Sequence, residues 1–263
     1  MAHYDVFNGD ADGICALHQL RMAHPADSRL VTGVKRDITL LDRVMAKPGD
    51  EITVLDISLD SNRAALLAVL EQGARVEYFD HHFPGEIPQN PAFTAHIDRT
   101  PDICTSLLVN RHLQNRHRIW AVVGAFGDNL RQSALNAAAP LALNAGQLTE
   151  LQSLGECLNY NAYGETVADL HFPPDELYRQ VHRYADPFAF INEEPAFRRL
   201  QQGYAEDLAE AEALTPEFAT ENCALYFLPD QAWSRRVSGS FGNRLAQAWP
   251  KRAHALLTRS SDG

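Results

Sequence analysis

Short apolar runs alternate with longer, helix-like segments over the first hundred residues. The runs have the length of strands and are rich in Val, Ile, Leu and aromatic residues. They lie at 3–7, 30–34, 52–55, 75–79 and 94–97. Between them, apolar residues recur at three- and four-residue spacing and predict helices at 13–22, 38–45 and 62–72. Strands that alternate with helices of this length predict βαβ units and a parallel sheet.

The rest of the chain predicts helices, followed by a second, smaller α/β unit. Residues 101–190 are mostly helical in pattern, and an acidic, solvated helix is expected at 195–214. The closing unit has four expected elements: strands at 223–228 and 253–258, a helix at 241–249, and a turn toward a further strand at 260–263.

Together these patterns predict a doubly wound, mainly parallel α/β sheet with a helical extension and a small, partial α/β domain at the C-terminal end. The expected divisions are 1–190 for the main domain, 191–220 for a helical linker and 221–263 for the partial domain. A chain of 263 residues is long enough to bury the core that this arrangement requires.

The charge, the cysteines and the apolar content of the chain limit which partners and which compartment are expected. The net charge of −11, from 34 acidic and 23 basic residues, disfavours long nucleic acid, because Lys and Arg are needed to neutralise its phosphates. The four cysteines form no CxxC pair, which is typical of reduced thiols in the cytoplasm. The sequence shows no secretory leader pattern and no run of about 18 apolar residues. We therefore expect a cytoplasmic protein without a membrane partner.

Acidic side chains follow three of the predicted strands. Asp10 and Asp12 come after the first strand, Asp56 comes after the third, and the triplet Asp80-His81-His82 comes after the fourth. Ligands of parallel α/β sheets bind beyond the carboxyl ends of the strands. The pattern of strands and the chemistry of these side chains therefore indicate one location.

Taken singly, these signals are weak. The turn at 10–13 also resembles a calcium loop, but the apolar residues at 14–17 exclude an EF-hand. Asp56 could cap a helix, although other residues nearby could do so. Adjacent histidines cannot easily point the same way, so one can bind metal while the other faces substrate, with Asp80 fixing a tautomer. Together, the carboxylates and imidazoles suit Mn²⁺, Fe²⁺ or Mg²⁺, and their charge predicts two cations.

Four motifs resemble those of the DHH phosphoesterases, the superfamily of the RecJ exonucleases, nanoRNA and pAp phosphatases, dinucleotide phosphodiesterases and family II pyrophosphatases. They are Asn8-Gly9-Asp10-Ala11-Asp12-Gly13, Val54-Leu55-Asp56-Ile57-Ser58, Asp80-His81-His82 and Gly127-Asp128-Asn129. Their order and spacing cover residues 1–130. The tail from Asn222, with 237–243, resembles the start of the associated DHHA1 substrate-binding domain.

The resemblance implies a centre of two divalent cations, usually Mn²⁺, with Mg²⁺, Fe²⁺ or Co²⁺ as alternatives. It implies that Asp56 bridges the two cations and that Asp10 contributes to one site. The other site would be completed by Asp12, His81 and Asp128. His82 would approach the scissile phosphate with Asp80 as its support, and water activated by the metals would attack phosphorus in line.

Two departures from the family pattern affect these expectations. Many members carry a histidine where this chain has Val6, and others carry Asp where it has Asn8. The first metal site is therefore expected to be weaker, or to use Asn8 or water. The sequence also lacks the GGGH loop of the DHHA1 domain, so the second domain is expected to be incomplete.

Asn8 and four further residues are candidates for binding substrate. Thr105 and Ser106 begin a helix predicted at 103–113 and could either hold a phosphate or cap the helix. Arg235 and Arg236 precede an expected turn at 238–240, and could either reach nucleotide phosphates or remain surface residues.

From these features we expect a two-metal phosphoesterase that hydrolyses phosphodiester bonds in small nucleotides, such as linear dinucleotides or short oligonucleotides. A pAp-like phosphomonoesterase and a RecJ-like single-strand exonuclease are the alternatives, and a non-catalytic nucleotide sensor is the alternative of another class. Because no basic or aromatic track runs along the chain, long duplex nucleic acid is not expected as a partner. A homodimer is left open.

Overall fold

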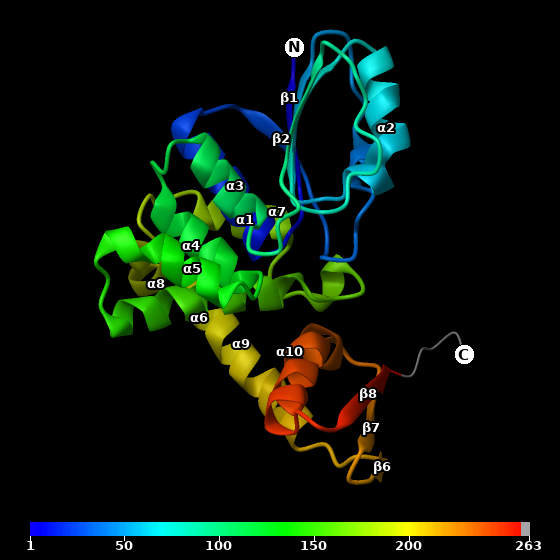
Figure 1. Ribbon diagram of the computed structural model, residues 1–263, viewed down its shortest axis with the longest axis vertical. Coiled ribbons are helices and arrows are strands. Elements are labelled where there is room, and N and C mark those ends of the chain that lie inside the picture. Colours follow the sequence, from blue (N-terminus) through cyan, green and yellow to red (C-terminus); the bar gives the residue numbers. More distant parts are fainter. Residues whose placement is uncertain (259–263) are drawn as a thin grey trace.

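The centre of the fold is a five-stranded sheet in which every strand runs parallel to its neighbours (Figure 1). The computed structural model describes residues 1–258, so the turn expected at 260–263 lies outside the described residues. The strands are β1 His3–Phe7, β2 Ser28–Val31, β3 Glu51–Leu55, β4 Arg75–Asp80 and β5 Phe93–Ile97. Their order is β2-β1-β3-β4-β5, so β1 lies between β2 and β3.

Helices cover both faces of this sheet, because successive side chains of a strand point to opposite faces. One face packs on α1 Ala11–Ala23, α3 Thr105–His112 and α4 Arg118–Gly127. The other face packs on α2 Leu59–Glu71 and the 3-10 turn η1 Leu40–Arg43. Phe7 and its neighbour Val6 show the alternation, since they belong to the first and second core respectively. The predicted doubly wound, parallel α/β class is confirmed.

The predicted helical extension follows α4. It consists of α5 Arg131–Ala138, η2 Ala139–Leu141, α6 Ala145–Ala162, η3 Val167–Asp169, α7 Pro174–Val181 and α8 Pro187–Glu193. Helix α6 packs against α4 so closely that Gly127 cannot be replaced: a Cβ there would lie 2.2 Å from the Ala11 Cβ and 2.8 Å from the Gly155 carbonyl oxygen. The extension thereby fixes the end of α4 beside the start of α1.

A long helix, α9 Pro195–Glu212, leads to the C-terminal unit (Figure 1). That unit contains β6 Phe218–Ala219, β7 Cys223–Leu228, α10 Ala232–Ala248 and β8 Ala253–Thr258. Strand β7 pairs antiparallel with β6 and parallel with β8. Helix α9 is not solvated all round as expected, because Phe197, Leu200 and Leu208 on one face are buried. Within residues 1–258, no helix is long and apolar enough to cross a membrane.

Two predicted elements need correction. The helix expected at 38–45 is only the short turn η1, because the side chain of Asn62 accepts the Leu41 N–H (3.1 Å) and donates to the Ile38 carbonyl (2.6 Å). The turn expected at 238–240 lies inside α10. There Val237, Phe241 and Leu245, spaced four residues apart, are buried against β7 and α9, and this packing outweighs the weak helix propensity of glycine and serine.

A buried histidine makes the fold sensitive to acid. His18 is fully buried; its Nδ1 lies 3.0 Å from His182 Nδ1 and its Nε2 lies 3.0 Å from the Tyr184 carbonyl oxygen. Burial, together with repulsion from His182 and His117, lowers the pKa of His18 to about 3. Because this pKa is depressed in the folded state, stability is complete above the unfolded value of about 6.5 and is lost as pH falls below it.

We therefore expect the free energy of unfolding to fall by about 2 kcal/mol between pH 7.5 and pH 5 through His18 alone. In His18→Gln this component of the decrease should be absent, whereas in the matched variant of an exposed histidine, His24→Gln, it should remain. Urea unfolding at both pH values measures the difference. Equal acid-induced losses in His18→Gln and the wild type would show that His18 does not carry the effect.

Candidate metal centre

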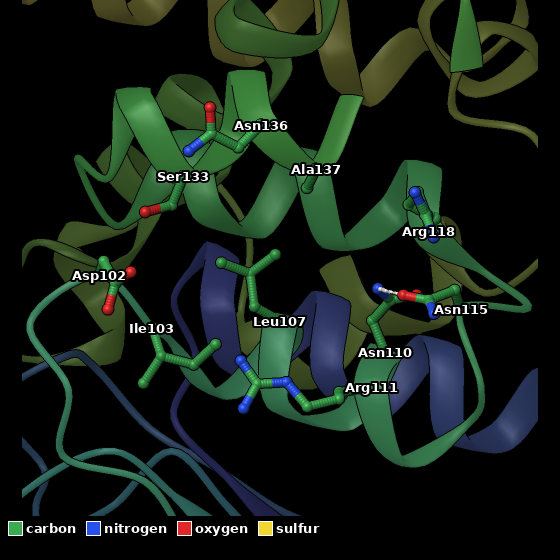
Figure 2. A pocket seen from close by; sticks show the side chains of 10 residues that line it. All are labelled: Asp102, Ile103, Leu107, Asn110, Arg111, Asn115, Arg118, Ser133, Asn136 and Ala137. Atoms are coloured by element: carbon green, nitrogen blue, oxygen red, sulfur yellow. Dashed lines mark hydrogen bonds between the residues drawn. The ribbon is translucent and has the colours of Figure 1, made fainter. Parts of the chain in front are cut away.

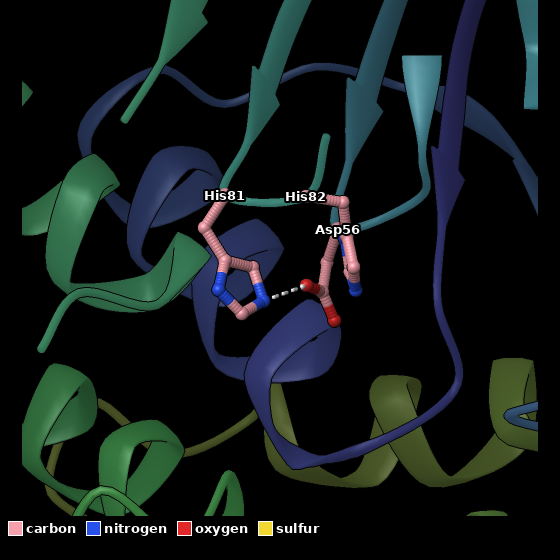
Figure 3. A group of neighbouring side chains, drawn as sticks. All are labelled: Asp56, His81 and His82. Carbon is pink, nitrogen blue, oxygen red and sulfur yellow. Dashed lines mark ion pairs between the residues drawn. The ribbon is translucent and has the colours of Figure 1, made fainter. Parts of the chain in front are cut away.

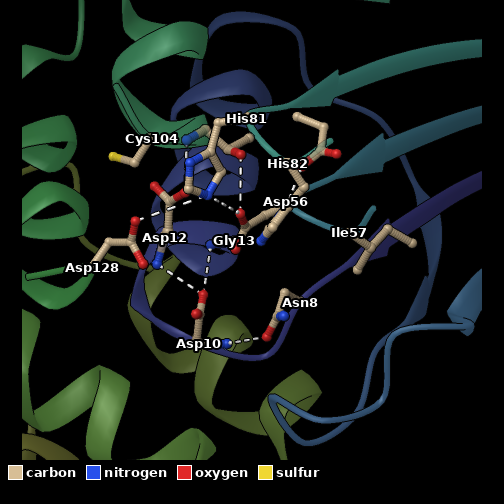
Figure 4. A network of polar contacts seen from close by, with 12 residues as sticks. Asn8, Asp10, Asp12, Gly13, Asp56, Ile57, His81, His82, Cys104 and Asp128 are labelled. Atoms are coloured by element: carbon tan, nitrogen blue, oxygen red, sulfur yellow. Dashed lines mark hydrogen bonds and ion pairs between the residues drawn. The ribbon is translucent and has the colours of Figure 1, made fainter. Parts of the chain in front are cut away.

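The acidic motifs meet at the carboxyl edge of the sheet, where β1 and β3 lie side by side. Strand β2 lies on one side of β1 and β3 lies on the other, so the chain reverses direction across the sheet at this point. In open α/β sheets, ligands bind in the crevice at such a switch point. Asp10 and Asp12 follow β1, Asp56 follows β3 and His81 follows β4, while Asp128 lies at the end of α4. Figure 4 shows these side chains converging on one space.

Asp10 is fixed by the first turn of α1. Its Oδ1 accepts hydrogen bonds from the backbone N–H groups of Asp12 (3.0 Å) and Gly13 (3.1 Å), so Asp10 is the N-cap of the helix. Gly13 has to be glycine, because a Cβ there would lie 2.2 Å from the carbonyl oxygen of Asn8. The first motif therefore shapes the loop as well as supplying carboxylates.

Asp12 is held by the N-terminus of α3. Its two carboxylate oxygens accept the N–H groups of Thr105 and Ser106, each at 2.7 Å, and the Thr105 hydroxyl donates to Asp56 at 3.0 Å. Thr105 and Ser106 are fully buried. The anion at this helix N-terminus is the Asp12 carboxylate, and substrate binding by Thr105 and Ser106 stays a prediction.

Asp56 occupies an unusual backbone conformation directly after β3. Its φ of 60° is left-handed, which aspartate tolerates better than most residues and which is frequent at functional sites. Its N–H donates to the Phe79 carbonyl (3.0 Å), so the turn is tied to β4. As Figure 3 shows, the carboxylate faces the imidazole of His81, with Oδ1 3.4 Å from Nε2.

The two histidines have different partners. His82 contacts Asp80 through Nδ1 (2.7 Å), and this hydrogen bond raises the pKa of His82 above its ordinary value. Asp80 is fully buried, whereas the side chain of His82 is 45% exposed. His81 instead turns its Nε2 toward Asp56 and Asp128. The geometry suits the predicted division, in which His81 meets the metal, His82 meets the substrate and Asp80 supports His82.

Among residues 1–258, two overlapping groups of side chains have the geometry to hold a cation. Ligand atoms of Asp12, His81 and Asp128 lie within 4.8 Å of one another, and so do those of Asp56, His81 and His82. Carboxylate and imidazole donors suit Mn²⁺, Fe²⁺ and Mg²⁺. In geometry and donor type, the residues therefore fit a divalent cation.

The electrostatics of the centre point the same way. Burial and repulsion from Asp12, Asp10 and Asp128 raise the pKa of Asp56 well above its ordinary value. Burial and the same acidic neighbours, Asp12 and Asp10, raise the pKa of Asp128 to about 8. Carboxylates crowded in this way cannot all ionise cheaply, and a divalent cation removes the repulsion.

Lys35 belongs to none of the four motifs, and the sequence did not predict its place in the centre. Lys35 lies beyond β2, and its Nζ pairs with Asp10 and lies 3.9 Å from Asp128 Oδ1. Burial disfavours the charged ammonium, but attraction to Asp10 outweighs it and the pKa of Lys35 is raised. Two features of the sequence could have indicated it. The chain has only three lysines, and Lys35 directly follows a predicted strand, at the edge of the sheet where the acidic residues lie.

The other predicted substrate residues lie in two places. Asn8 lines the pocket, but its Oδ1 accepts the Asp10 N–H (3.2 Å) and its Nδ2 contacts the Lys35 carbonyl (3.5 Å). Arg235 pairs with Asp169 at 2.6 Å, and Arg236 pairs with Asp207 at 2.7 Å. These pairs join α10 to η3 and α9. Substrate binding by Asn8, Arg235 and Arg236 stays a prediction.

The convergence creates a small pocket of about 160 Å³. It is lined by Asn8, Asp10, Lys35, Ile38, Asp56, Ile57, Ser58, His81, His82 and Asp128. A second cavity, of about 240 Å³, lies between α3 and α5 (Figure 2). Its lining contains one carboxylate, Asp102, and no imidazole, so it offers no comparable ligand set.

Several solved structures have a similar fold. The exonuclease RecJ bound to manganese matches 97% of this chain and 75% of its own, at 17% identity and a TM-score of 0.58. RecJ from Thermus thermophilus in complex with Mn²⁺ matches 98% of this chain and 43% of its own, at 17% identity and a TM-score of 0.56. CDC45 from Entamoeba histolytica matches 99% of this chain and 82% of its own, at 7% identity and a TM-score of 0.62.

No family model matches the chain, and no curated protein sequence matches it. The identities to the solved structures are low, so the likeness concerns the fold. The chain has a fold similar to that of RecJ, a member of the superfamily that its four motifs resemble.

Proposed function

We propose that this protein is a phosphoesterase that depends on a divalent metal and hydrolyses phosphodiester bonds in small nucleotides. The observation that carries the proposal is the convergence of Asp12, Asp56, His81 and Asp128 on one pocket at the switch point of the sheet. Mn²⁺ is the proposed cation, and the presence of Mn²⁺ in two RecJ structures of the same fold supports it.

The residues around the pocket have different proposed roles in hydrolysis. Bound at the carboxylates, the cation supplies Lewis acidity toward a phosphoryl oxygen and makes water a stronger nucleophile. His82, oriented by Asp80, presents its Nε2 to the pocket and donates a hydrogen bond to the phosphoryl group as negative charge develops there. Lys35 adds a fixed positive charge on the same pocket wall.

The shape of the site supports a small substrate. The pocket of about 160 Å³ offers space for a phosphoryl group. A third cavity, of about 330 Å³, lies between α6 and α10. Its wall contains Asn159, which accepts a hydrogen bond from Lys35, and Asn129, which follows Asp128 in the chain. We assign the nucleoside to that cavity. The net charge of −11 opposes binding of long strands.

A panel of substrates tests this proposal. With Mn²⁺, we expect kcat/KM for a linear dinucleotide to exceed that for a single-stranded DNA of fifty nucleotides by about tenfold or more, since the long strand adds phosphate repulsion without adding basic contacts. The release of nucleoside monophosphate, measured by chromatography, gives both rates. Faster cleavage of the long strand would contradict the small-substrate proposal while leaving phosphoesterase activity in place.

A RecJ-like single-strand exonuclease is the second candidate, because two RecJ structures share the fold over nearly the whole of this chain. The same panel distinguishes the two candidates, since an exonuclease would prefer the long strand. A pAp-like phosphomonoesterase would release inorganic phosphate instead.

A further inference from the structure

Lys35 is built into the carboxylate cluster. Its backbone N–H donates to the Ala162 carbonyl (2.9 Å), so the end of α6 fixes the start of the side chain. Its Nζ pairs with Asp10 Oδ2, donates to Asn159 Oδ1 at 3.2 Å, and lies 5.6 Å from the centre of the Tyr163 ring. A lysine held by several partners is a permanent part of the centre and differs from a mobile surface charge.

Asp10 has both carboxylate oxygens engaged by the protein itself. Oδ1 caps α1, and Oδ2 pairs with Lys35. Asp12 also has both oxygens engaged, but by neutral backbone N–H groups, whereas the ammonium on Asp10 repels a cation. Asp10 also belongs to neither of the two groups of ligand atoms found among residues 1–258. The side chains nearby do not replace it: Val6 on β1 is apolar and buried in the opposite core, and the oxygen of Asn8, just after β1, accepts the Asp10 N–H.

The two groups that can hold a cation also share one donor. His81 belongs to both, and the same atom, Nε2, lies 3.4 Å from Asp56 Oδ1 and 3.9 Å from Asp128 Oδ2. One imidazole nitrogen can bind only one cation. The two groups are therefore parts of one cation site and do not form two separate sites.

We propose that the centre holds a single divalent cation, bound by Asp12, Asp56, His81 and Asp128, and that the Lys35 ammonium takes the place of a second one. This rests on the proposed function and revises the two cations that the sequence predicts. Lys35 neutralises Asp10 and offers a positive charge to the phosphoryl group, as a second cation would, but without exchange with solvent.

Metal stoichiometry tests the proposal directly. The protein is stripped with chelator, saturated with Mn²⁺, desalted and analysed by mass spectrometry for manganese per chain, and by electron paramagnetic resonance. We expect about one equivalent and the spectrum of an isolated Mn²⁺ ion. Two equivalents with an exchange-coupled spectrum would overturn the proposal and leave the phosphoesterase function intact. No bound metal would overturn the proposed function itself.

The substitution Lys35→Met tests the role of the ammonium. It releases Asp10 Oδ2, so the bound manganese should rise from about one to about two equivalents, with the appearance of exchange coupling. Lys47→Met is the matched control: it removes the same charge from the exposed loop before β3, at the opposite edge of the sheet, and should leave one equivalent. Lys35→Arg keeps the charge and should also bind one.

A value of one equivalent in folded Lys35→Met would overturn the assignment of Lys35. Circular dichroism establishes whether that variant is folded. If Lys35→Met does not fold, the manganese content of the wild type and of Lys35→Arg still tests the proposal, because two equivalents in either protein would contradict it.

Discussion

Replacing Asp56 with asparagine is expected to reduce phosphodiester hydrolysis by about 10³-fold or more, which corresponds to about 4 kcal/mol of transition-state stabilisation. Asp56 is buried, faces His81 at 3.4 Å and accepts the Thr105 hydroxyl. Asparagine keeps the size and the hydrogen bond but removes the negative charge that holds the cation. Steady-state rates with a linear dinucleotide, and manganese content after desalting, measure the loss.

The same substitution should stabilise the protein after metal removal. Burial and neighbouring carboxylates raise the pKa of Asp56, so ionised Asp56 costs stability as pH rises above its unfolded pKa of about 4. At pH 7.5, Asp56→Asn removes this cost, and the melting temperature of the stripped protein should rise by a few degrees, roughly 2–4 °C for each kcal/mol. Loss of activity together with a gain in stability separates a ligand from a residue needed for folding.

Asp27→Asn is the matched control for Asp56→Asn. Asp27 is exposed in the segment before β2, at the opposite edge of the sheet. We expect its activity, metal content and melting temperature to equal those of the wild type. Retention of full activity by Asp56→Asn would contradict the assignment of Asp56 as a metal ligand.

Replacing His82 with asparagine is expected to lower kcat by about 10²-fold while the bound manganese stays unchanged. The amide nitrogen of asparagine occupies the position of His82 Nδ1, so it can still donate to Asp80, whose pairing with His82 is 2.7 Å. Only the Nε2 that meets the phosphoryl group is removed. The effect should therefore appear in kcat and leave KM nearly unchanged.

The manganese content of His82→Asn separates two roles. His82 also belongs to a group of possible ligands with Asp56 and His81. If His82 were a ligand, its replacement would lower the manganese content together with the rate, and our assignment would fail. His24→Asn, at the exposed end of α1, controls for the loss of an imidazole and should change neither quantity.

Much of the fold follows from local patterns. The five strands of the main sheet and α1, α2 and α3 correspond to predicted strands and helices, because the burial of one or both faces dictates the period of the apolar residues. The pattern failed where distant contacts decide. Asn62 of α2 holds 38–45 in a short turn, and the core beneath α10 keeps a helix through the serines and glycine at 238–240.

The candidate centre shows the same division. The strand pattern alone was enough to predict which acidic and imidazole side chains gather in one place, because residues that follow parallel strands lie at the same edge of the sheet. Only the tertiary structure decided how they are used. It turned the amides of Thr105 and Ser106 toward Asp12, and it brought Lys35 to Asp10 across 25 residues of chain. A motif records spacing along the chain, whereas the pairing of charges depends on distances that only the folded molecule sets.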